Sequence, residues 1–338
     1  MTDTQSGRKG EFDQILLPPG PHVQTAPPPA GSRESKLAGE TMGTVWVLTA
    51  LLPPTVADDA VRATLEGVFA RIVAQMSQWE EGSELSVFNR APAATRHAIG
   101  SDFARVLDCA IGVAQASGGA FDPTIGATAQ LWGFGSSPAP SRMPDAENAS
   151  RTRLYDWRDL RREDGGRTLV QPGGLTLDFS GIAKGHAVDA GMMALHDIGL
   201  NHALLEIGGE LRGSGLRADG MPWWTDLETP PGSATLHARV GLTGWSIGTS
   251  GSYLRRRQAG GKSWSHTIDP VSGMPVVDDI LSVSVLHPGC MQADALATAI
   301  IALGPKTGKE FADDNAIPAR IVLRNETLQS SAWRGWVD

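Results

Sequence analysis

The chain has 338 residues, a formal net charge of −8 at pH 7 and two cysteines, Cys109 and Cys290. Two cysteines exclude a disulfide framework and a metal cluster built from cysteines, and a negative charge without a basic stripe argues against a nucleic-acid-binding protein. No run of about 18 consecutive apolar residues occurs, so the sequence predicts no membrane-spanning helix. This length suits one large domain or two modest ones.

Residues 1–37 are polar and rich in proline, and they lack helical or strand periodicity, so we expect a flexible or loosely docked arm there. We expect a single domain over residues 38–325 and a polar tail over residues 326–338. The N-terminus shows no basic segment followed by an apolar run, so no secretory signal is visible. As the sequence stands, we expect a cytoplasmic protein; a periplasmic address stays open if an export signal is missing from this sequence.

Hydrophobic periodicity predicts helices and strands in mixed order along the chain. Residues 58–77 and 101–117 carry apolar side chains at helical spacing, and Gly118-Gly119 ends the second of these helices. Further helices are expected at residues 182–195 and 293–303, and strands at residues 45–51, 175–179, 203–207, 235–240, 280–286 and 319–323. The 40 glycines and 22 prolines imply many turns. The pattern therefore predicts a loop-rich fold of mixed α and β elements.

Asp294 and Thr298 lie four residues apart near the start of the helix expected at residues 293–303, so both side chains share one face. A carboxylate and a hydroxyl suit a hard cation such as Mg²⁺, particularly where substrate phosphates complete its ligand shell. Alternatively, Asp294 complements the helix dipole in the first turn and Thr298 packs in the core. The spacing alone leaves both interpretations open.

A strand, a turn at Ser180-Gly181 and a helix with Lys184 in its first turn form a second candidate site. The amides at such a helix start, together with the lysine charge, favour an anion. An ordinary connection with an exposed Lys184 is the alternative. Further along, Gly208-Gly209 follows the strand expected at residues 203–207, and glycines there allow the backbone to approach a ligand closely.

Eight groups of short motifs follow one another between residues 39 and 304. They are Met42-Gly43-Thr44; Ser83-Glu84-Leu85-Ser86 with Phe88-Asn89; Phe121-Asp122-Pro123-Thr124 with Leu131-Trp132-Gly133-Phe134; Asp178 through Lys184-Gly185 and Asp189; Ile207-Gly208-Gly209; Thr249-Ser250-Gly251; His266 through Pro270 with Gly273; and Asp294 with Thr298. In this order, the motifs resemble those of the ApbE-type flavin transferases.

The resemblance implies an FAD:protein FMN transferase with an α+β fold of mixed sheets and packed helices, in which two intimately associated subdomains hold the flavin site between them. Such an enzyme uses Mg²⁺ and cleaves the pyrophosphate of its substrate FAD. It attaches the FMN half through a phosphoester to a Thr or Ser hydroxyl of an acceptor flavoprotein and releases AMP. Many members are exported and carry a lipid on a cysteine; this chain has no such cysteine, which puts that address in doubt.

The matching positions imply a set of site residues. His266 is the implied catalytic base, and Gly181, Asp294 and Thr298 are the implied metal ligands, with Gly181 acting through its carbonyl oxygen. The implied FAD-binding residues are Met42, Trp79, Ala120, Phe121, Asp122, Asp178, Lys184 and Ile268.

The chemistry of these residue types agrees with that assignment, while several alternatives stay open. A Thr hydroxyl is a poor nucleophile at neutral pH, so a nearby histidine would help as a base, although His266 could instead cap the turn at Asp269-Pro270. Trp79 and Phe121 could stack on an aromatic ring of FAD or serve as core aromatics. The same site with water as the nucleophile would be an FAD pyrophosphatase, and a non-catalytic flavin-binding protein is a third possibility.

Overall fold

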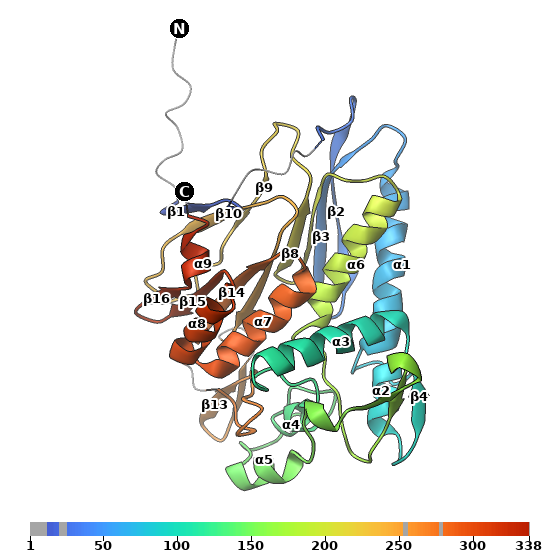
Figure 1. Ribbon diagram of the computed structural model, residues 1–338, viewed down its shortest axis with the longest axis vertical. Coiled ribbons are helices and arrows are strands. Elements are labelled where there is room, and N and C mark those ends of the chain that lie inside the picture. Colours follow the sequence, from blue (N-terminus) through green and yellow to red (C-terminus); the bar gives the residue numbers. More distant parts are fainter. Residues whose placement is uncertain (1–11, 20–25, 253–255, 277–279, 338) are drawn as a thin grey trace.

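The computed structural model describes residues 12–19, 26–252, 256–276 and 280–337. Within them, the largest element is an antiparallel sheet of eight strands in the order β16-β15-β14-β11-β8-β7-β3-β2 (Figure 1). These strands are β2 (Arg33–Thr41), β3 (Thr44–Leu52), β7 (Ala203–Ile207), β8 (Glu210–Ser214), β11 (Ser246–Gly251), β14 (Ile280–His287), β15 (Ala319–Leu323) and β16 (Thr327–Gln329). The strands predicted at residues 45–51, 203–207, 280–286 and 319–323 are confirmed.

Three long helices cover one face of this sheet (Figure 1): α1 (Asp58–Met76), α6 (Ala183–Asp197) and α7 (Cys290–Leu303). Beside them lie α3 (Ser101–Ala116), which packs on α1 and α7, and α8 (Pro305–Asp314), which follows α7. Val61 and Leu65 of α1 are fully buried, so the apolar spacing that predicted this helix is also the face that packs. All four predicted helices are confirmed, and the α+β fold class with them.

Smaller elements gather at one end of this layered core (Figure 1). They are α2 (Glu84–Arg90), β4 (Arg96–Ala98), α4 (Gly126–Leu131), α5 (Ala146–Thr152), η1 (Trp157–Asp159), β5 (Arg161–Glu163), η2 (Asp164–Gly166), β6 (Thr168–Val170), and the hairpin of β12 (Arg256–Ala259) and β13 (Lys262–Ser265). Trp132, Trp264 and Ile268 are buried there in a cluster apart from the main core. This end carries much of the candidate site described below.

The strand predicted at residues 175–179 is wrong. The segment alternates buried side chains as a strand does, with Leu175, Leu177 and Phe179 all almost fully buried. Side-chain amides replace a neighbouring strand: Asn89 bonds the backbone N–H and C=O of Leu177, and Gln171 bonds those of Leu175. Thr176 makes a single parallel bridge to Ile125, so the segment stays extended but belongs to none of the sheets.

Part of the arm predicted over residues 1–37 forms β-strands, and for those residues the prediction of a flexible segment is wrong. Residues 33–37 belong to β2, which pairs along its whole length with β3. Nearer the N-terminus, β1 (Gln14–Leu16) pairs in parallel with β10 (Ala238–Leu242), which also pairs with β9 (Trp223–Asp226). The strand predicted at residues 235–240 therefore begins later, at Ala238. Backbone pairing needs no apolar periodicity, which is why the polar composition did not reveal these strands. Residues 1–11 and 20–25 of the predicted arm lie outside the described part of the chain.

The polar tail predicted over residues 326–338 contains regular structure. It contains β16, which extends the large sheet, and α9 (Ser331–Arg334). Trp333 is fully buried, and Trp336 packs edge-on against Trp245 with ring centroids 4.7 Å apart. Both tryptophans share a hydrophobic cluster with Leu16, so the two ends of the described chain close one core region. Across the described residues, no helix has both the length and the apolar character needed to span a membrane.

Candidate functional site

One cavity of about 240 Å³ collects nearly all of the predicted site residues. Its wall is formed by the turn after β7, the end of β11, the start of α6 and one face of α7. The smaller elements and the loops beside them complete the wall. All but Met42 line it: His266, Trp79, Ala120, Phe121, Asp122, Asp178, Lys184, Ile268, Gly181, Asp294 and Thr298. Segments that are far apart in the sequence therefore meet around one space.

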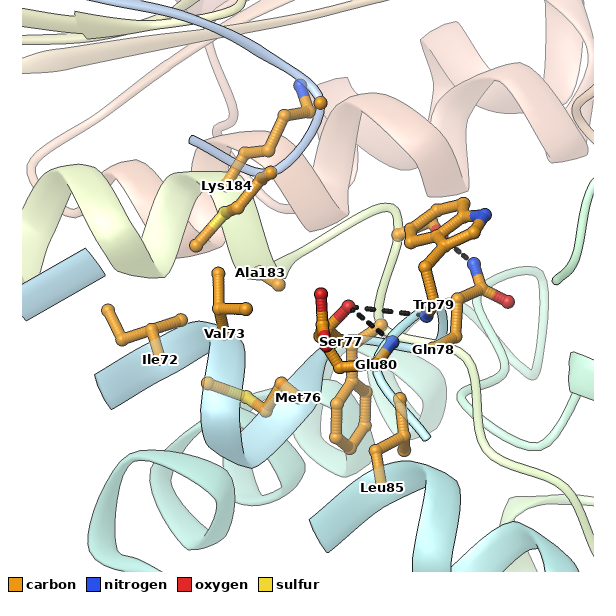
Figure 2. Close-up of a pocket in the computed structure, with 14 residues that line it drawn as sticks. Ile72, Val73, Met76, Ser77, Gln78, Trp79, Glu80, Leu85, Ala183 and Lys184 are labelled. Atoms are coloured by element: carbon orange, nitrogen blue, oxygen red, sulfur yellow. Dashed lines mark hydrogen bonds between the residues drawn. The ribbon is translucent and has the colours of Figure 1, made fainter. Parts of the chain in front are cut away.

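Met42 lines a second, larger cavity of about 450 Å³ that adjoins the first (Figure 2). Trp79, Ser180 and Lys184 line both cavities, so the two lie side by side. Met76 and other apolar side chains of α1 form much of the wall. Together the two cavities offer an apolar part and a charged part, as an elongated ligand with an aromatic and a phosphate portion would require.

Two features of the larger cavity follow from local backbone geometry. Met42 and Gly43 form the two-residue turn between β2 and β3, with φ of 50° and 70°. A methionine at positive φ is uncommon, and such strained positions gather at ligand sites. Ser77 ends α1, and its hydroxyl accepts the N–H groups of Trp79 and Glu80 (Figure 2). The Trp79 side chain is 60% exposed at the cavity, so it is not a core aromatic.

The two predicted metal-binding side chains lie on the cavity face of α7. Asp294 is only 2% exposed, and its Oδ2 accepts the N–H of Gly185 at 3.0 Å. The Thr298 hydroxyl lies 3.2 Å from that of Ser250. Gly181 adjoins Thr298 closely, because a Cβ at Gly181 would lie 2.8 Å from the Thr298 hydroxyl oxygen. The three residues therefore bring a carboxylate, a hydroxyl and a peptide group to one place.

The alternative in which Asp294 complements the helix dipole is wrong. The helix begins at Cys290, earlier than predicted, so Asp294 lies beyond its first residues. Asp189 takes that role, because its carboxylate accepts the N–H groups of Cys290 and Met291, each at 3.0 Å. Among the described residues, no group of three or more His, Cys, Asp or Glu side chains could hold a metal ion. A cation at Asp294 would need hydroxyl, carbonyl, water or substrate oxygens as well.

Glu210 is a site residue that the motif comparison did not assign. It is 1% exposed, lines the cavity with Asp294, and lies 2.5 Å from the Lys184 ammonium through Oε1. Burial and the nearby Asp294 carboxylate raise the pKa of Glu210 to about 8, against the attraction of Lys184. Burial likewise raises the pKa of Asp294. The only signal in the sequence was an acidic residue directly after Gly208-Gly209.

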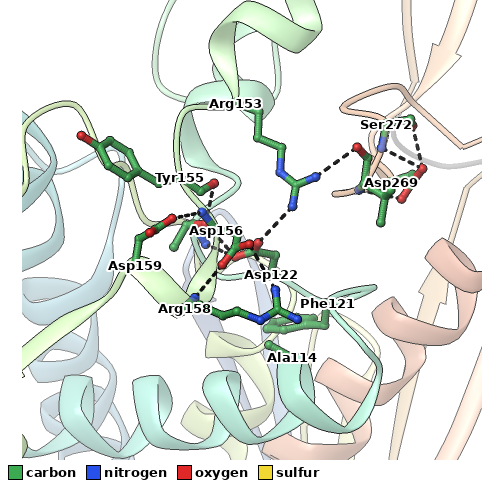
Figure 3. A network of polar contacts seen from close by, with 12 residues as sticks. Ala114, Phe121, Asp122, Arg153, Tyr155, Asp156, Arg158, Asp159, Asp269 and Ser272 are labelled. Atoms are coloured by element: carbon green, nitrogen blue, oxygen red, sulfur yellow. Dashed lines mark hydrogen bonds and ion pairs between the residues drawn. The ribbon is translucent and has the colours of Figure 1, made fainter.

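Asp178 and Asp122 are held by local turns. Asp178 accepts the N–H of Ser180 at 2.7 Å, and Asp122 accepts both the N–H and the hydroxyl of Thr124. Burial raises the pKa of both carboxyl groups. Figure 3 shows Arg153 between Asp122 and the turn of Asp269, with a distance of 3.8 Å between its guanidinium and the Asp122 carboxylate. These contacts fix both carboxylates on the cavity wall.

His266 follows β13 and lines the cavity beside Phe134. Their ring centroids are 6.1 Å apart with an edge-on geometry of 69°. The Arg257 guanidinium also contacts Phe134, at 5.8 Å from the centroid of its ring. Its Nε donates a hydrogen bond to the Gly133 carbonyl. The strand pair β12 and β13 and the segment of Phe134 thus hold the histidine ring from one side.

The turn after His266 is capped by Asp269. Its carboxylate accepts the N–H groups of Val271 and Ser272, at 2.9 and 3.1 Å. The capping role that was the alternative for His266 therefore falls to Asp269. His266 is half-buried and lines the cavity that also contains Asp294 and Thr298.

Comparisons with known proteins agree with this geometry. The ApbE family matches residues 42–321. The chain is 32% identical over 292 residues to the FAD:protein FMN transferase of Vibrio cholerae, covering 86% of this chain and 87% of that protein. It is 31% identical to the FAD:protein FMN transferase of Haemophilus influenzae, covering 88% and 90% of the two chains.

Two solved structures are similar over nearly their whole length. The flavin transferase ApbE from Vibrio cholerae has a TM-score of 0.81 at 32% identity, covering 90% of this chain and 99% of that chain. The apo form of the Pseudomonas stutzeri flavinyl transferase ApbE has a TM-score of 0.83 at 30% identity, covering 90% and 97%. With its motifs, fold and relatives in agreement, this chain belongs to the ApbE family.

Proposed function

We propose that this chain transfers the FMN half of FAD to a Thr or Ser hydroxyl of an acceptor flavoprotein and releases AMP. The observation that carries the proposal is the gathering of the predicted FAD-binding, metal-binding and basic residues around two adjoining cavities. The proposal is also supported by relatives named FAD:protein FMN transferases, which align over most of both chains.

We propose that Asp294, Thr298 and the Gly181 carbonyl hold Mg²⁺. These are oxygen donors, which this cation prefers, and they leave positions for phosphate oxygens and water. The electrostatics also fit, because Glu210 and Asp294 are both almost fully buried, and the Lys184 ammonium is paired with Glu210. Burial disfavours the charged form of both carboxyl groups, as their raised pKa values show, and a divalent cation at Asp294 would favour that charged form. When bound, Mg²⁺ would polarise the pyrophosphate and offset the charge that develops on it.

The chain's own residues would then place the substrate and move one proton. Lys184, at the start of α6, would bind the FAD phosphates, while the apolar wall by Met42 and the exposed Trp79 would take an aromatic part of FAD. His266 would accept the proton of the acceptor hydroxyl as its oxygen forms a bond to the FMN phosphorus. The bond from that phosphorus to the bridging oxygen breaks, and AMP leaves with the electron pair.

The test is a transfer assay with purified components. The protein is incubated with FAD, Mg²⁺ and a candidate acceptor, then the acceptor is weighed by mass spectrometry and AMP is quantified. A mass gain of one FMN with equimolar AMP supports the proposal, and an EDTA-treated sample should give neither product. AMP and FMN without a modified acceptor would indicate an FAD pyrophosphatase. Binding of FAD with neither product would indicate a flavin-binding protein.

A further inference from the structure

Glu210 is held rigidly by contacts at both of its carboxylate oxygens. It is the first residue of β8 and follows a tight turn in which Gly208 and Gly209 have φ of 55° and 94°. Its Oε2 accepts the N–H of Thr249, in the middle of the neighbouring strand β11, at 3.2 Å. Its Oε1 accepts a hydrogen bond from the Lys184 ammonium at 2.5 Å. Two strands of the large sheet therefore fix the direction in which this carboxylate points.

Lys184 gains its position from that carboxylate. A lysine side chain loses conformational entropy when it is ordered, so an exposed lysine is a poor fixed ligand for phosphate. Here the Lys184 side chain is 21% exposed, and its ammonium also lies 3.5 Å from the Gly208 carbonyl. An ammonium has three N–H donors in tetrahedral directions, so the bond to Glu210 sets where the others point. The lysine is thereby ordered at the cavity before any ligand arrives.

The charges around Lys184 explain why a carboxylate is tolerated in a phosphate-binding region. A lone buried glutamate would repel a pyrophosphate, and here Asp294 adds a second negative charge. A divalent cation held at Asp294 would offset that charge and leave Lys184 and Glu210 as a balanced pair. The pair then offers the phosphates oriented N–H donors instead of a mobile charge.

We infer that Glu210 is a positioning residue for the phosphates of FAD, acting through Lys184 and not by contact with the substrate. The inference rests on the proposed function, since it deepens the role of the same site. It assigns a role to the acidic residue after Gly208-Gly209, and it predicts that the effects of changing Glu210 and Lys184 depend on each other.

The test compares Glu210→Gln with the matched control Glu206→Gln. Gln keeps the size of the side chain and an oxygen that can accept the Thr249 N–H, but it loses the charge that orders Lys184. Glu206 lies on the adjacent strand β7 and does not line either cavity. Losing one oriented charge-assisted hydrogen bond should raise the KM for FAD about tenfold in Glu210→Gln, with a smaller change in kcat. Glu206→Gln should match the wild type.

A double-mutant cycle separates positioning from a merely structural role. Lys184→Met should raise the KM for FAD at least as much as Glu210→Gln, and adding Glu210→Gln to Lys184→Met should change it by less than about twofold. The double variant should also unfold at a higher temperature than Lys184→Met, because it no longer buries an unpaired carboxylate.

The outcomes are distinct. An unchanged KM in Glu210→Gln, or additive effects in the double variant, would overturn the inference while leaving FMN transfer intact. A lower unfolding temperature without a change in KM would mean that Glu210 only stabilises the fold. If Glu210→Gln cannot be purified in folded form, Glu210→Asp replaces it, because the shorter side chain keeps the charge but does not reach Lys184. An unchanged KM for FAD in Glu210→Asp would also overturn the inference. Failure of the wild-type protein to modify any acceptor counts against the proposed function instead.

Discussion

Replacing Asp294 by Asn should abolish the stabilisation of the protein by Mg²⁺ while preserving the fold. Asn has the size of Asp, and its carbonyl oxygen can still accept the N–H of Gly185, which Asp294 bonds at 3.0 Å. The substitution also removes a buried charge that faces Glu210. The unfolding temperature without Mg²⁺ should therefore stay the same or rise, whereas Ala at this position would leave the buried Gly185 N–H without its acceptor, at about 1–3 kcal/mol.

The expected magnitude follows from linkage. With FAD present, Mg²⁺ at 100 times its dissociation constant stabilises the folded protein by about 2.7 kcal/mol. An unfolding entropy of about 2.1 cal/mol/K per residue over 338 residues is about 0.7 kcal/mol/K, so the unfolding temperature should rise by about 4 °C. If loss of the carboxylate weakens the metal about 100-fold, the same Mg²⁺ concentration should shift Asp294→Asn by less than about 1 °C.

The assay is thermal unfolding at fixed protein and saturating FAD, with and without Mg²⁺. Asp59→Asn, which changes an exposed carboxylate at the start of α1, is the matched control and should keep the wild-type shift. A full Mg²⁺ shift in Asp294→Asn would refute the assignment of Asp294 as a metal ligand. Loss of the shift in Asp59→Asn would mean that the response reports general screening by salt and not a site.

Three further predictions follow from named contacts. His266→Asn should lower the rate of FMN transfer about 10²–10⁴-fold with little change in FAD affinity measured by flavin fluorescence, and a rate near the wild-type value would rule out its role as base. Burial and Asp294 raise the pKa of Glu210 to about 8 from 4.5, so the stability due to this group is fully present below about pH 4.5 and is lost as the pH rises through about 8. Urea unfolding of the metal-free protein should therefore show a steeper loss of stability between pH 5 and 8 in the wild type than in Glu210→Gln. Equal slopes would contradict this prediction. Trp333→Ala should cost about 3–5 kcal/mol of unfolding free energy, since Trp333 is fully buried in the C-terminal cluster, and a loss below about 1 kcal/mol would show that the tail is not part of the core.

Much of the secondary structure was predictable because its signal is local. In α1 and α3 the apolar residues that recur every three or four positions are the ones that pack, and in β7 the bounds match the prediction at both ends. The family was predictable for a different reason: motifs at the turns and helix starts that line the cavities keep their order along the chain. Those motifs contain most of the residues that line the cavities, although Trp79, Ala120 and Glu210, among others, lie outside them.

Contacts between distant residues decided what the sequence left open. The pattern at residues 175–179 is that of a strand, yet the side chains of Asn89 and Gln171 take the backbone bonds that a neighbouring strand would have made. Likewise, polar composition predicted a flexible or loosely docked arm and a polar tail, but it did not show that β1 pairs with β10 or that Trp333 is buried in a core cluster. Composition says little about such pairing, because the partners lie elsewhere in the chain.

The site divides in the same way. The sequence by itself placed Asp294 and Thr298 on one helix face and, through the order of its motifs, determined the family and a set of candidate site residues. Only the tertiary structure decided that Asp189, and not Asp294, caps α7, and that Glu210 meets Lys184. The physical reason is that capping, ion pairing and the cost of a buried charge depend on which groups share a water-poor space, and that space exists only once the sheet and helices have packed.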